Sequence, residues 1–172
     1  MLTARQIEEK GIIYVSPQYS DKVEYAPAQV GIDLHIVKVD KLKKGGLIPR
    51  EGKTVLGPTK PVPPKKGKWK LRPGVYEIQL AEGCKFDAYT CGKITHRSSC
   101  YRNGVEIESP WFDPGFETDS MGTFMEVKVP VTIECFARVA QIAVFTTEEA
   151  AELYNGQFQN DKQRKSKKKE GK

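Results

Sequence analysis

The residues best suited to chemistry begin with the triplet Arg97-Ser98-Ser99. Short hydroxyls suit the capping of a helical turn, and the first N–H groups of such a turn can bind an anion. The planar guanidinium beside them matches two oxygens of a phosphate. These residue types in this order predict an anion site.

A rigid aromatic turn follows after eleven intervening residues, with the sequence WFDPGF at residues 111–116. Proline fixes φ at Pro114, and glycine at Gly115 permits backbone conformations that other residues resist. Asp113 supplies the one carboxylate of the turn. An anion site beside this turn could hold a nucleotide. The structural alternative is a capped turn followed by a core hairpin.

The chain lacks the ligand pattern of a zinc-dependent deaminase. Those enzymes use an H-x-E motif together with a C-x-x-C pair. The two histidines, His35 and His96, are not followed by x-Glu, and the four cysteines form no C-x-x-C pair. The sequence therefore excludes a zinc-dependent deaminase.

The charge is distributed unevenly along the chain. The net charge is +6, but residues 41–75 hold 11 basic residues and one acid, and residues 160–172 hold 7 basic residues and two acids. The remaining residues carry 10 basic and 19 acidic side chains, a net charge of −9. An acidic body with basic segments is not a uniformly basic nucleic-acid binder, so we expect no nucleic-acid partner.

The length of 172 residues is sufficient for one domain with a sizeable core, which we place at residues 1–159. No apolar run approaches the length of a membrane span, and the N-terminal residues are too polar for a signal peptide. We therefore expect a cytoplasmic protein with reduced thiols and no membrane partner.

The elements that must position the chemical residues are mostly short strands. Pro and Gly total 26 residues and the apolar segments are short, which favours an all-β fold. Short helices are predicted at residues 3–9, where Thr3 and Gln6 can form a capping box, and at residues 147–152. Alternating or apolar patterns predict strands at residues 12–15, 31–39, 75–80, 123–129, 131–135 and 136–145, and another within residues 86–94.

Two segments do not fit this pattern of strands. Residues 41–74 form a basic Pro/Lys-rich insertion, interpreted either as a solvated loop or as a flap that steers a polyanionic substrate or another chain. Trp69 indicates that the end of this insertion packs down as a strand. Residues 160–172 are predicted to be a disordered basic tail.

Two motifs together closely resemble the dCTP deaminase and dUTPase family. The deaminase branch of that family carries Arg-Ser-Ser-x-x-Arg followed by Trp-Ile-Asp-Pro-Gly-Phe, and this chain has RSSCYR at residues 97–102 and WFDPGF at residues 111–116. The resemblance extends to GIDL at residues 31–34, RVAQ at residues 138–141 and YNGQFQ at residues 154–159. The insertion is not matched, and the segment after Phe116 is longer than usual.

The resemblance implies an all-β fold, a distorted jelly-roll (β-clip) barrel with one or two short helices. It also implies a homotrimer with active sites at subunit interfaces. The implied function is hydrolytic deamination of dCTP to dUTP, with onward conversion to dUMP in a bifunctional enzyme. The alternatives are a dUTPase and a non-catalytic nucleotide-binding or regulatory protein. Mg²⁺ would enter with the triphosphate, held mainly by phosphate oxygens and water.

The resemblance also implies roles for individual residues. Glu126 would be the general base, Ser98 would position the water, and Arg102 would stabilise the ring. Substrate binding would fall to residues that hold phosphate (Arg97 and Ser99), the 3′-hydroxyl (Asp113), the sugar (Phe116) and the closing C-terminal arm (Tyr154 and Gln159). Asp33 and Gln141 are interpreted as structural.

Some residues leave alternatives open. Glu126 alternates with Met125 and Val127, so it can also be a glutamate on the solvent face of a strand. The fallback candidates for the general base are Glu106, Glu108 and Glu117. Arg102 favours the deaminase over the dUTPase, whereas Ser109 stands where the deaminase branch has alanine. In the arm, Gln157 and Phe158 replace a lysine and a tyrosine, and Lys162 or Arg164 could restore the phosphate contact.

Overall fold

The computed structural model describes residues 1–156 and 159. The described residues form two short α-helices, α1 (Ala4–Glu9) and α2 (Ser98–Arg102), and one 3-10 turn, η1 (Pro17–Tyr19). Neither described helix is long and apolar enough to cross a membrane. The other elements are the strands β1 (Ile13–Val15), β2 (Ala26–Pro27), β3 (Ile32–Leu42), β4 (Thr59–Pro61), β5 (Lys68–Leu71), β6 (Gly74–Leu80), β7 (Glu82–Lys85), β8 (Thr90–His96), β9 (Val105–Glu108), β10 (Glu117–Thr118), β11 (Gly122–Val127), β12 (Val131–Glu134) and β13 (Arg138–Thr146).

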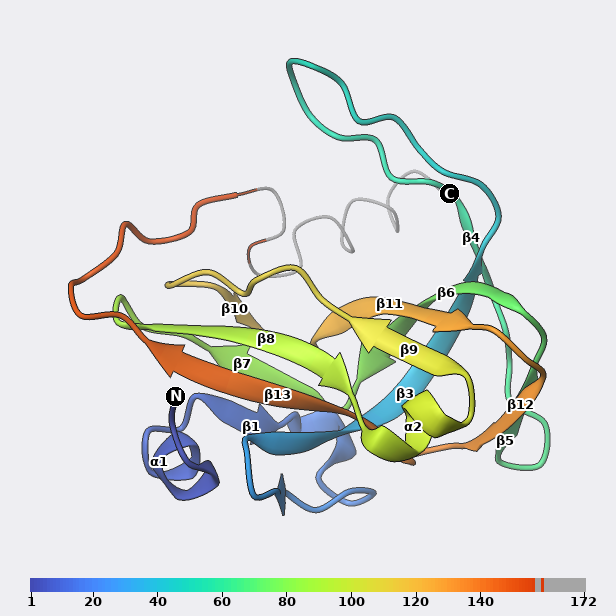
Figure 1. The fold of residues 1–172 in the computed structure, drawn as a ribbon, viewed down its shortest axis with the longest axis horizontal. Coiled ribbons are helices and arrows are strands. Elements are labelled where there is room, and N and C mark those ends of the chain that lie inside the picture. Colours follow the sequence, from blue (N-terminus) through green and yellow to red (C-terminus); the bar gives the residue numbers. More distant parts are fainter. Residues whose placement is uncertain (157–158, 160–172) are drawn as a thin grey trace.

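Six strands close into a barrel in the order β13-β8-β9-β11-β6-β3, because β13 also pairs with β3. All of these pairs are antiparallel. Two smaller sheets, β1-β7-β10 and β5-β12, lie against the barrel (Figure 1). Closure protects the strand edges of the barrel. The predicted all-β barrel fold with two short helices is confirmed.

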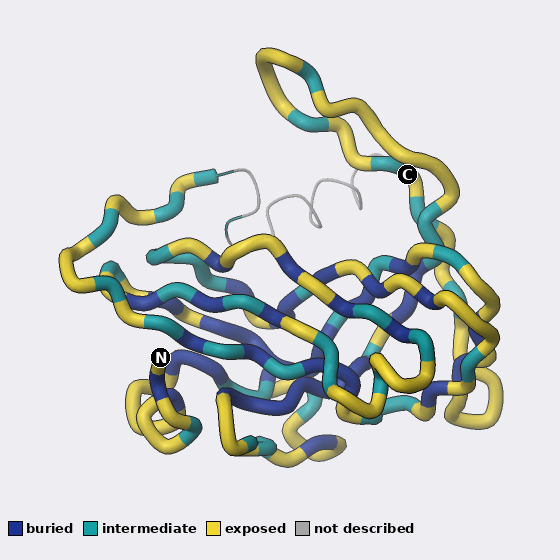
Figure 2. Tube along the Cα trace, in the orientation of Figure 1, coloured by how far each residue is buried: buried dark blue, intermediate teal, exposed yellow. Residues whose placement is uncertain are grey.

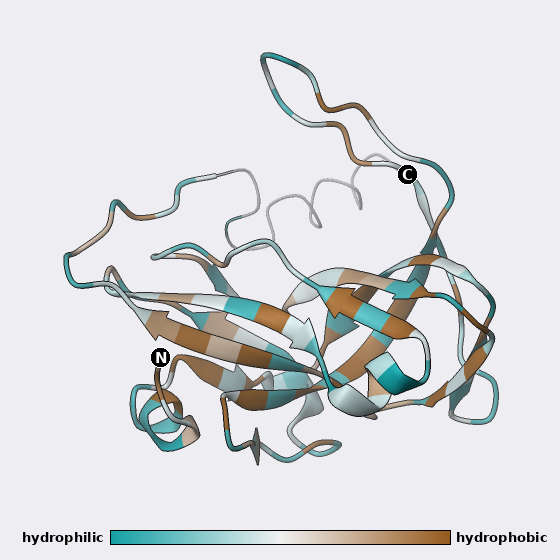
Figure 3. Ribbon diagram, viewed as in Figure 1, coloured by the Kyte–Doolittle hydropathy of each residue, from teal (hydrophilic) through white to brown (hydrophobic). Residues whose placement is uncertain are grey.

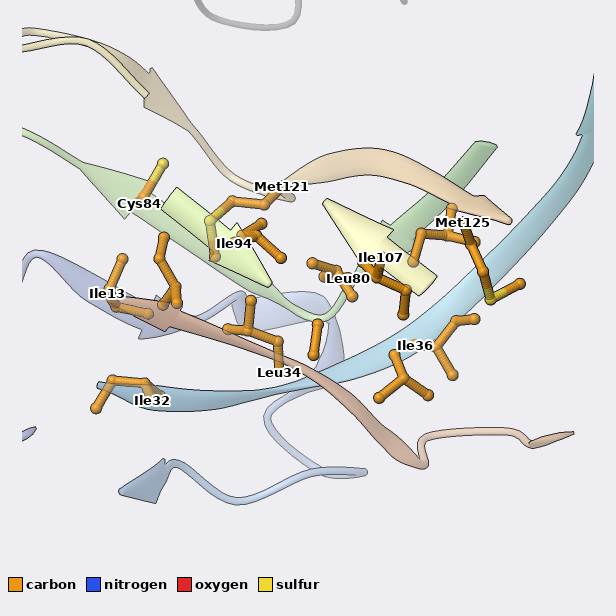
Figure 4. Close-up of a cluster of buried hydrophobic side chains, with 14 of the residues drawn as sticks. Ile13, Ile32, Leu34, Ile36, Leu80, Cys84, Ile94, Ile107, Met121 and Met125 are labelled. Carbon is orange, nitrogen blue, oxygen red and sulfur yellow. The ribbon is translucent and has the colours of Figure 1, made fainter. Parts of the chain in front are cut away.

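The core follows from the alternation of side chains along the barrel strands. In β11, Thr123, Met125 and Val127 are buried, while Phe124 and Glu126 are exposed. Figures 2 and 3 show the same alternation of buried, hydrophobic positions with exposed, hydrophilic ones on neighbouring strands. Burial of each large apolar side chain contributes roughly 1.5–3 kcal/mol. Figure 4 shows the residues that converge in the interior, among them Ile32, Leu34, Ile36, Leu80, Ile94, Ile107 and Met125.

The N-terminal elements match their sequence patterns. The N–H of Gln6 donates to the hydroxyl of Thr3 at 3.3 Å, and the side-chain oxygen of Gln6 accepts from the Thr3 N–H at 3.0 Å. This reciprocal pair confirms the capping box of α1. The predicted strand within residues 86–94 begins only at Thr90, because the Asp87 carboxylate accepts the Tyr89 N–H (2.9 Å) and the Thr90 hydroxyl (2.7 Å) and so stabilises a turn.

The helix predicted at residues 147–152 is wrong. The N–H of Thr147 donates to the carbonyl of Tyr89 at 2.9 Å, and the N–H of Ala151 donates to the carbonyl of Ala88 at 2.8 Å. The segment therefore runs irregularly alongside the connection between β7 and β8. The Thr147 hydroxyl donates to the Glu149 carbonyl at 2.7 Å instead of accepting an N–H as a helix cap, so the contacts with this connection prevail.

The insertion at residues 41–74 contains β4, β5 and a hairpin that projects from the barrel (Figure 1). In the hairpin, Leu47 and Val55 exchange two backbone hydrogen bonds, at 2.9 and 3.0 Å. Glycine is required at Gly46, because a Cβ there would lie 1.9 Å from the Val55 carbonyl oxygen. Trp69 on β5 is 2% exposed, which confirms that the end of the insertion packs down as a strand.

Candidate active site

The anion motif forms the start of α2, directly after β8. Arg97 is extended (φ −73°, ψ 151°) and is the N-cap residue, and its side chain makes no capping hydrogen bond. The prediction that the serine hydroxyls cap this turn is therefore wrong. Ser98 and Ser99 occupy the first helical positions, one step beyond the cap position, from which a side chain reaches the free N–H groups. The N–H of Arg97 donates to the Val139 carbonyl on β13 at 3.1 Å.

A buried carboxylate holds Arg97 in place. Asp33 Oδ2 lies 3.0 Å from Nε of Arg97 and 3.5 Å from a terminal nitrogen of Arg138. Asp33 is 4% exposed. The three residues meet because β13 pairs with both β3 and β8, so that Gln141 faces Asp33 on one side and Thr95 on the other. Asp33 thus has the structural role that the sequence predicted, and it positions the arginine of the anion motif.

The aromatic turn lines a cavity of about 440 Å³. Strands β9 and β11 are paired as far as Glu108 and Phe124, and beyond this pair they diverge. After β9, the chain runs alongside β8, where Phe112 and Gly92 exchange hydrogen bonds of 2.8 and 3.0 Å. The chain that precedes β11 lies alongside β7, with which β10 pairs. The cavity takes its lining from both diverging segments, among them the short side chains of Thr118, Ser120 and Thr123.

Three of the predicted substrate-binding residues meet at this cavity: Asp113, Phe116 and Tyr154. The Phe116 and Tyr154 rings lie 5.6 Å apart and edge to face. The turn is closed by a hydrogen bond of 3.0 Å from the Phe116 N–H to the Asp113 carbonyl, and Gly115 takes a left-handed φ of 80°. Flat aromatic walls with one carboxylate suit a sugar and a planar base.

The C-terminal arm packs on the same turn. The N–H of Tyr154 donates to the Pro114 carbonyl at 2.7 Å. The side chain of Gln159 accepts the Glu117 N–H at 3.1 Å and donates to the Gly115 carbonyl at 2.7 Å. Gln159 therefore holds the arm to the turn, and it is not among the residues that line the cavity. The predictions for Gln157, Phe158, Lys162, Arg164 and the tail at residues 160–172 lie outside the described residues.

Glu126 lies near the edge of this cavity. Side chains two residues apart on a strand share a face and lie roughly 6–7 Å apart, so Glu126 shares the exposed face of Phe124, which lines the cavity. It pairs across the sheet with Glu106, whose carboxylate binds Lys128 Nζ at 2.6 Å. This hydrogen bond raises the pKa of Lys128. Within one chain, Glu126 is exposed.

The fallback glutamates differ in their surroundings. Glu106 is engaged by Lys128, and Glu117 lies 3.8 Å from Lys85 Nζ. Glu108 is exposed at the last pair before the strands diverge. Glu108 and Glu126 thus share the outer face of the sheet beside the cavity.

The two clusters lie at opposite ends of β8. Phe112 pairs with Gly92 near the start of the strand, and Arg97 follows its last residue, five residues further on. At about 3.3 Å per residue, these points are roughly 16 Å apart. Figure 1 shows α2 at the arrowhead end of β8. One chain therefore brings together Asp113, Phe116 and Tyr154 in the cavity and, separately, Arg97, Ser98, Ser99 and Arg102 around α2.

The thiols beside the two clusters are weak nucleophiles. Burial raises the pKa of Cys91, and the negative charge of Asp113 raises it further. Burial also raises the pKa of Cys100 on α2, although Arg97 opposes this effect. Because the thiolate is the nucleophilic form of cysteine, these shifts disfavour Cys91 and Cys100 as nucleophiles.

The cavity also uses residues that the motifs did not indicate. Glu77 on β6 lines it, as do Leu42 and Leu56, which lie at the two ends of the projecting hairpin. Glu77 occupies an outward-facing position in a strand whose residues alternate in burial. From the sequence, such a position is expected only to contact solvent. Leu56 belongs to the segment that was interpreted as a solvated loop or flap. Only strand pairing places these residues at the cavity.

Comparison with known sequences identifies relatives over most of the chain. A family profile described as dCTP deaminase-like matches residues 2–147. The deoxyuridine 5′-triphosphate nucleotidohydrolase of Methanocaldococcus jannaschii is 31% identical over 131 residues, which are 74% of this chain and 83% of that protein. The probable deoxyuridine 5′-triphosphate nucleotidohydrolase of Methanopyrus kandleri is 32% identical over 145 residues, 80% of this chain and 89% of that protein.

Comparison with solved structures finds the same fold in 2′-deoxycytidine 5′-triphosphate deaminase from Agrobacterium tumefaciens. The TM-score is 0.60 at 12% sequence identity, and the match covers 83% of this chain. It spans 46% of the length of that deaminase chain. At this identity the likeness shows the fold alone.

Proposed function

Because the chain belongs to the dCTP deaminase-like family, we propose that it is an enzyme that hydrolyses dCTP to dUTP and ammonia. The observation that carries this proposal is the arrangement of α2. Ser98 and Arg102 are four residues apart and Ser99 and Arg102 are three apart, so the arginine shares one face of the helical turn with the serines. The deaminase branch keeps an arginine at this position, and dUTPases generally do not.

In the proposed reaction, the Glu126 carboxylate accepts a proton from water, and the water oxygen attacks C4 of the cytosine ring. This proton passes to N3 of the ring, and Glu126 then carries the proton of the new C4 hydroxyl to the amino group. The C4–N bond breaks, ammonia leaves, and the C4 carbonyl forms. Ser98 positions the water. Arg102 stabilises the negative charge that develops on the ring. Arg97 and Ser99 bind phosphate, and Asp113 binds the 3′-hydroxyl.

We propose that Mg²⁺ accompanies the triphosphate and neutralises part of its charge. The described residues bring together no three His, Cys, Asp or Glu side chains that could hold a metal ion. The ligands in this proposal are therefore phosphate oxygens and water, which Mg²⁺ readily keeps.

We further propose that the complete site forms between subunits of a homotrimer. The sugar of a nucleotide is joined to its first phosphate by a single methylene and one oxygen, whereas the cavity and Arg97 of one chain lie on opposite ends of β8. The surfaces are complementary in charge, because α2 carries Arg97 and Arg102 and the face beside the cavity carries Glu108 and Glu126. A neighbour's α2 placed over this face would supply the missing half of the site.

The shared site is tested by mixing two inactive variants. Arg102→Ala removes the helix contribution, and Asp113→Ala removes the cavity contribution. When the two variants are unfolded and reassembled together, about a quarter of randomly mixed interfaces should combine an intact helix with an intact cavity. Recovered activity in the mixture, but not in either variant treated alone, supports the shared site. Absence of recovery in mixed trimers would place both halves in one subunit.

The second candidate function is dUTP hydrolysis to dUMP and diphosphate, which is favoured by the names of the two archaeal relatives. Product analysis distinguishes the candidates: the protein is incubated with Mg²⁺ and either dCTP or dUTP, and the nucleotides are separated by chromatography. Formation of dUTP alone from dCTP identifies a deaminase, and formation of dUMP from dCTP identifies a bifunctional enzyme. Turnover of dUTP alone identifies a dUTPase. The absence of any turnover would favour a nucleotide-binding protein.

A further inference from the structure

The cavity contains a carboxylate to which neither the motifs nor the proposed reaction gives a role. Glu77 lies in the middle of β6, is half-buried, and lines the same cavity as Asp113. No hydrogen bond or ion pair joins its side chain to another residue in the part of the chain that the structure describes. Among the described residues of the lining, Glu77 and Asp113 are the charged side chains, and both are acidic.

Strand pairing places Glu77 beside a second carboxylate, that of Asp40, on the same face of the sheet. Glu77 pairs with Phe124 on one side and with Asp40 on the other, and paired side chains share one face of the sheet. Asp40 is 6% exposed, and its Oδ2 binds Lys38 Nζ at 2.5 Å. Its Oδ1 is buried and has no hydrogen-bond partner among the residues that the structure describes. Asp40 is not among the residues that line the cavity, so a ligand would meet the Glu77 carboxylate itself, which favours a ligand that donates hydrogen bonds.

The other walls select the shape of the ligand. The lining includes the aromatic side chains Trp111, Phe116, Phe124 and Tyr154, which suit the faces of a planar ring. A pyrimidine base presents either an amino group or a carbonyl group at C4. The amino group of cytosine donates hydrogen bonds and matches a carboxylate, whereas the C4 carbonyl of uracil accepts them and is repelled.

We propose that Glu77 is a specificity-determining residue that accepts a hydrogen bond from the exocyclic amino group of cytosine. This inference rests on the proposed nucleotide site and deepens it. Glu77 would favour dCTP over dUTP at binding. It would also weaken binding of the product dUTP, because deamination replaces the amino group, a hydrogen-bond donor, with a carbonyl acceptor next to the same carboxylate.

The test compares the dissociation constants of dCTP and dUTP for the wild type and for Glu77→Gln, measured calorimetrically with Ca²⁺ in place of Mg²⁺ and with the nucleotides checked for turnover. A charge-assisted hydrogen bond should make the wild type favour dCTP roughly 10-fold to 100-fold. The amide of glutamine can either accept or donate, so Glu77→Gln should bring the ratio of the two constants close to one. Glu134→Gln, at an exposed position of β12, is the matched control and should keep the wild-type ratio.

A second variant separates charge from reach. Glu77→Asp keeps the negative charge, but its side chain is shorter by one methylene, so the carboxylate lies farther from the base. We therefore expect dCTP to bind more weakly, whereas dUTP should remain weakly bound. A wild-type ratio in Glu77→Gln would overturn the inference. An equal weakening of both nucleotides would also overturn it, because it would show a contact with the sugar. If the wild type binds dCTP and dUTP equally well, Glu77 does not read the base. If it binds neither nucleotide, the proposed function fails, and this inference fails with it.

Discussion

Asp33→Asn is the substitution that best tests how the anion motif is positioned. The change keeps the size of the side chain and removes its charge. The ion pair with Arg97, whose N···O distance is 3.0 Å, lies between exposed pairs, which contribute roughly 0.2–1 kcal/mol, and buried pairs, whose disruption costs roughly 3–5 kcal/mol. The contact with Arg138 is longer, at 3.5 Å, and that side chain is 51% exposed, so it adds less than about 1 kcal/mol.

The arginine that remains is not trapped in the core. Because the Arg97 side chain is 33% exposed, water can partly solvate it after the substitution. The loss of roughly 3–5 kcal/mol found for fully buried pairs is therefore too large an expectation here. We expect Asp33→Asn to lower the free energy of unfolding by about 2–3 kcal/mol. With a urea slope of about 2 kcal/mol per molar, the midpoint should fall by roughly 1–1.5 M.

The assay combines stability with binding. Urea unfolding at a fixed protein concentration gives the stability, and Asp21→Asn on an exposed loop is the control, expected to change it by less than about 0.5 kcal/mol. The dissociation constant for dCTP should rise about 10-fold, because Arg97 is no longer oriented toward phosphate. Arg97→Ala completes a double-mutant cycle with an expected coupling of about 1–2 kcal/mol. Strictly additive effects on binding would refute the idea that Asp33 positions Arg97.

Further predictions concern catalysis and pH. Glu126→Ala should lower the deamination rate at least about 100-fold while dCTP still binds, as measured by single-turnover kinetics; a rate near that of the wild type would exclude Glu126 as the general base. Arg102→Ala should reduce dCTP deamination far more than any dUTP hydrolysis, and equal losses in the two product assays would remove the main reason to favour a deaminase. Burial and Asp119 raise the pKa of Tyr14 to about 12, whereas an unfolded tyrosine ionises near pH 10. The folded state therefore keeps a proton that the unfolded state loses, so the free energy of unfolding should fall between about pH 10 and pH 12. Tyr14→Phe should make that fall shallower in urea titrations, and an unchanged slope would contradict the assignment.

Local sequence patterns predicted much of the fold because they depend on near neighbours. Alternation of apolar and polar residues located the barrel strands at residues 31–39 and 75–80 to within a few positions. The capping box at Thr3 and Gln6 specified α1 through contacts within one turn. The same reasoning failed at residues 147–152, where hydrogen bonds to a distant connection prevail over a short helical pattern.

The sequence by itself determined the all-β class, the anion motif, the aromatic turn and the family, since each depends on residue type and short spacing. Only the tertiary structure decided that Arg97 forms an ion pair with Asp33 and that the two motifs lie at opposite ends of β8. It also decided that Glu77 and Leu56 line the cavity. The physical reason is that a period of two says which side of a strand faces inward but not which strand lies beside it. The neighbours of Asp33 and Glu77 come from pairings between residues far apart in the chain, and those pairings create the site.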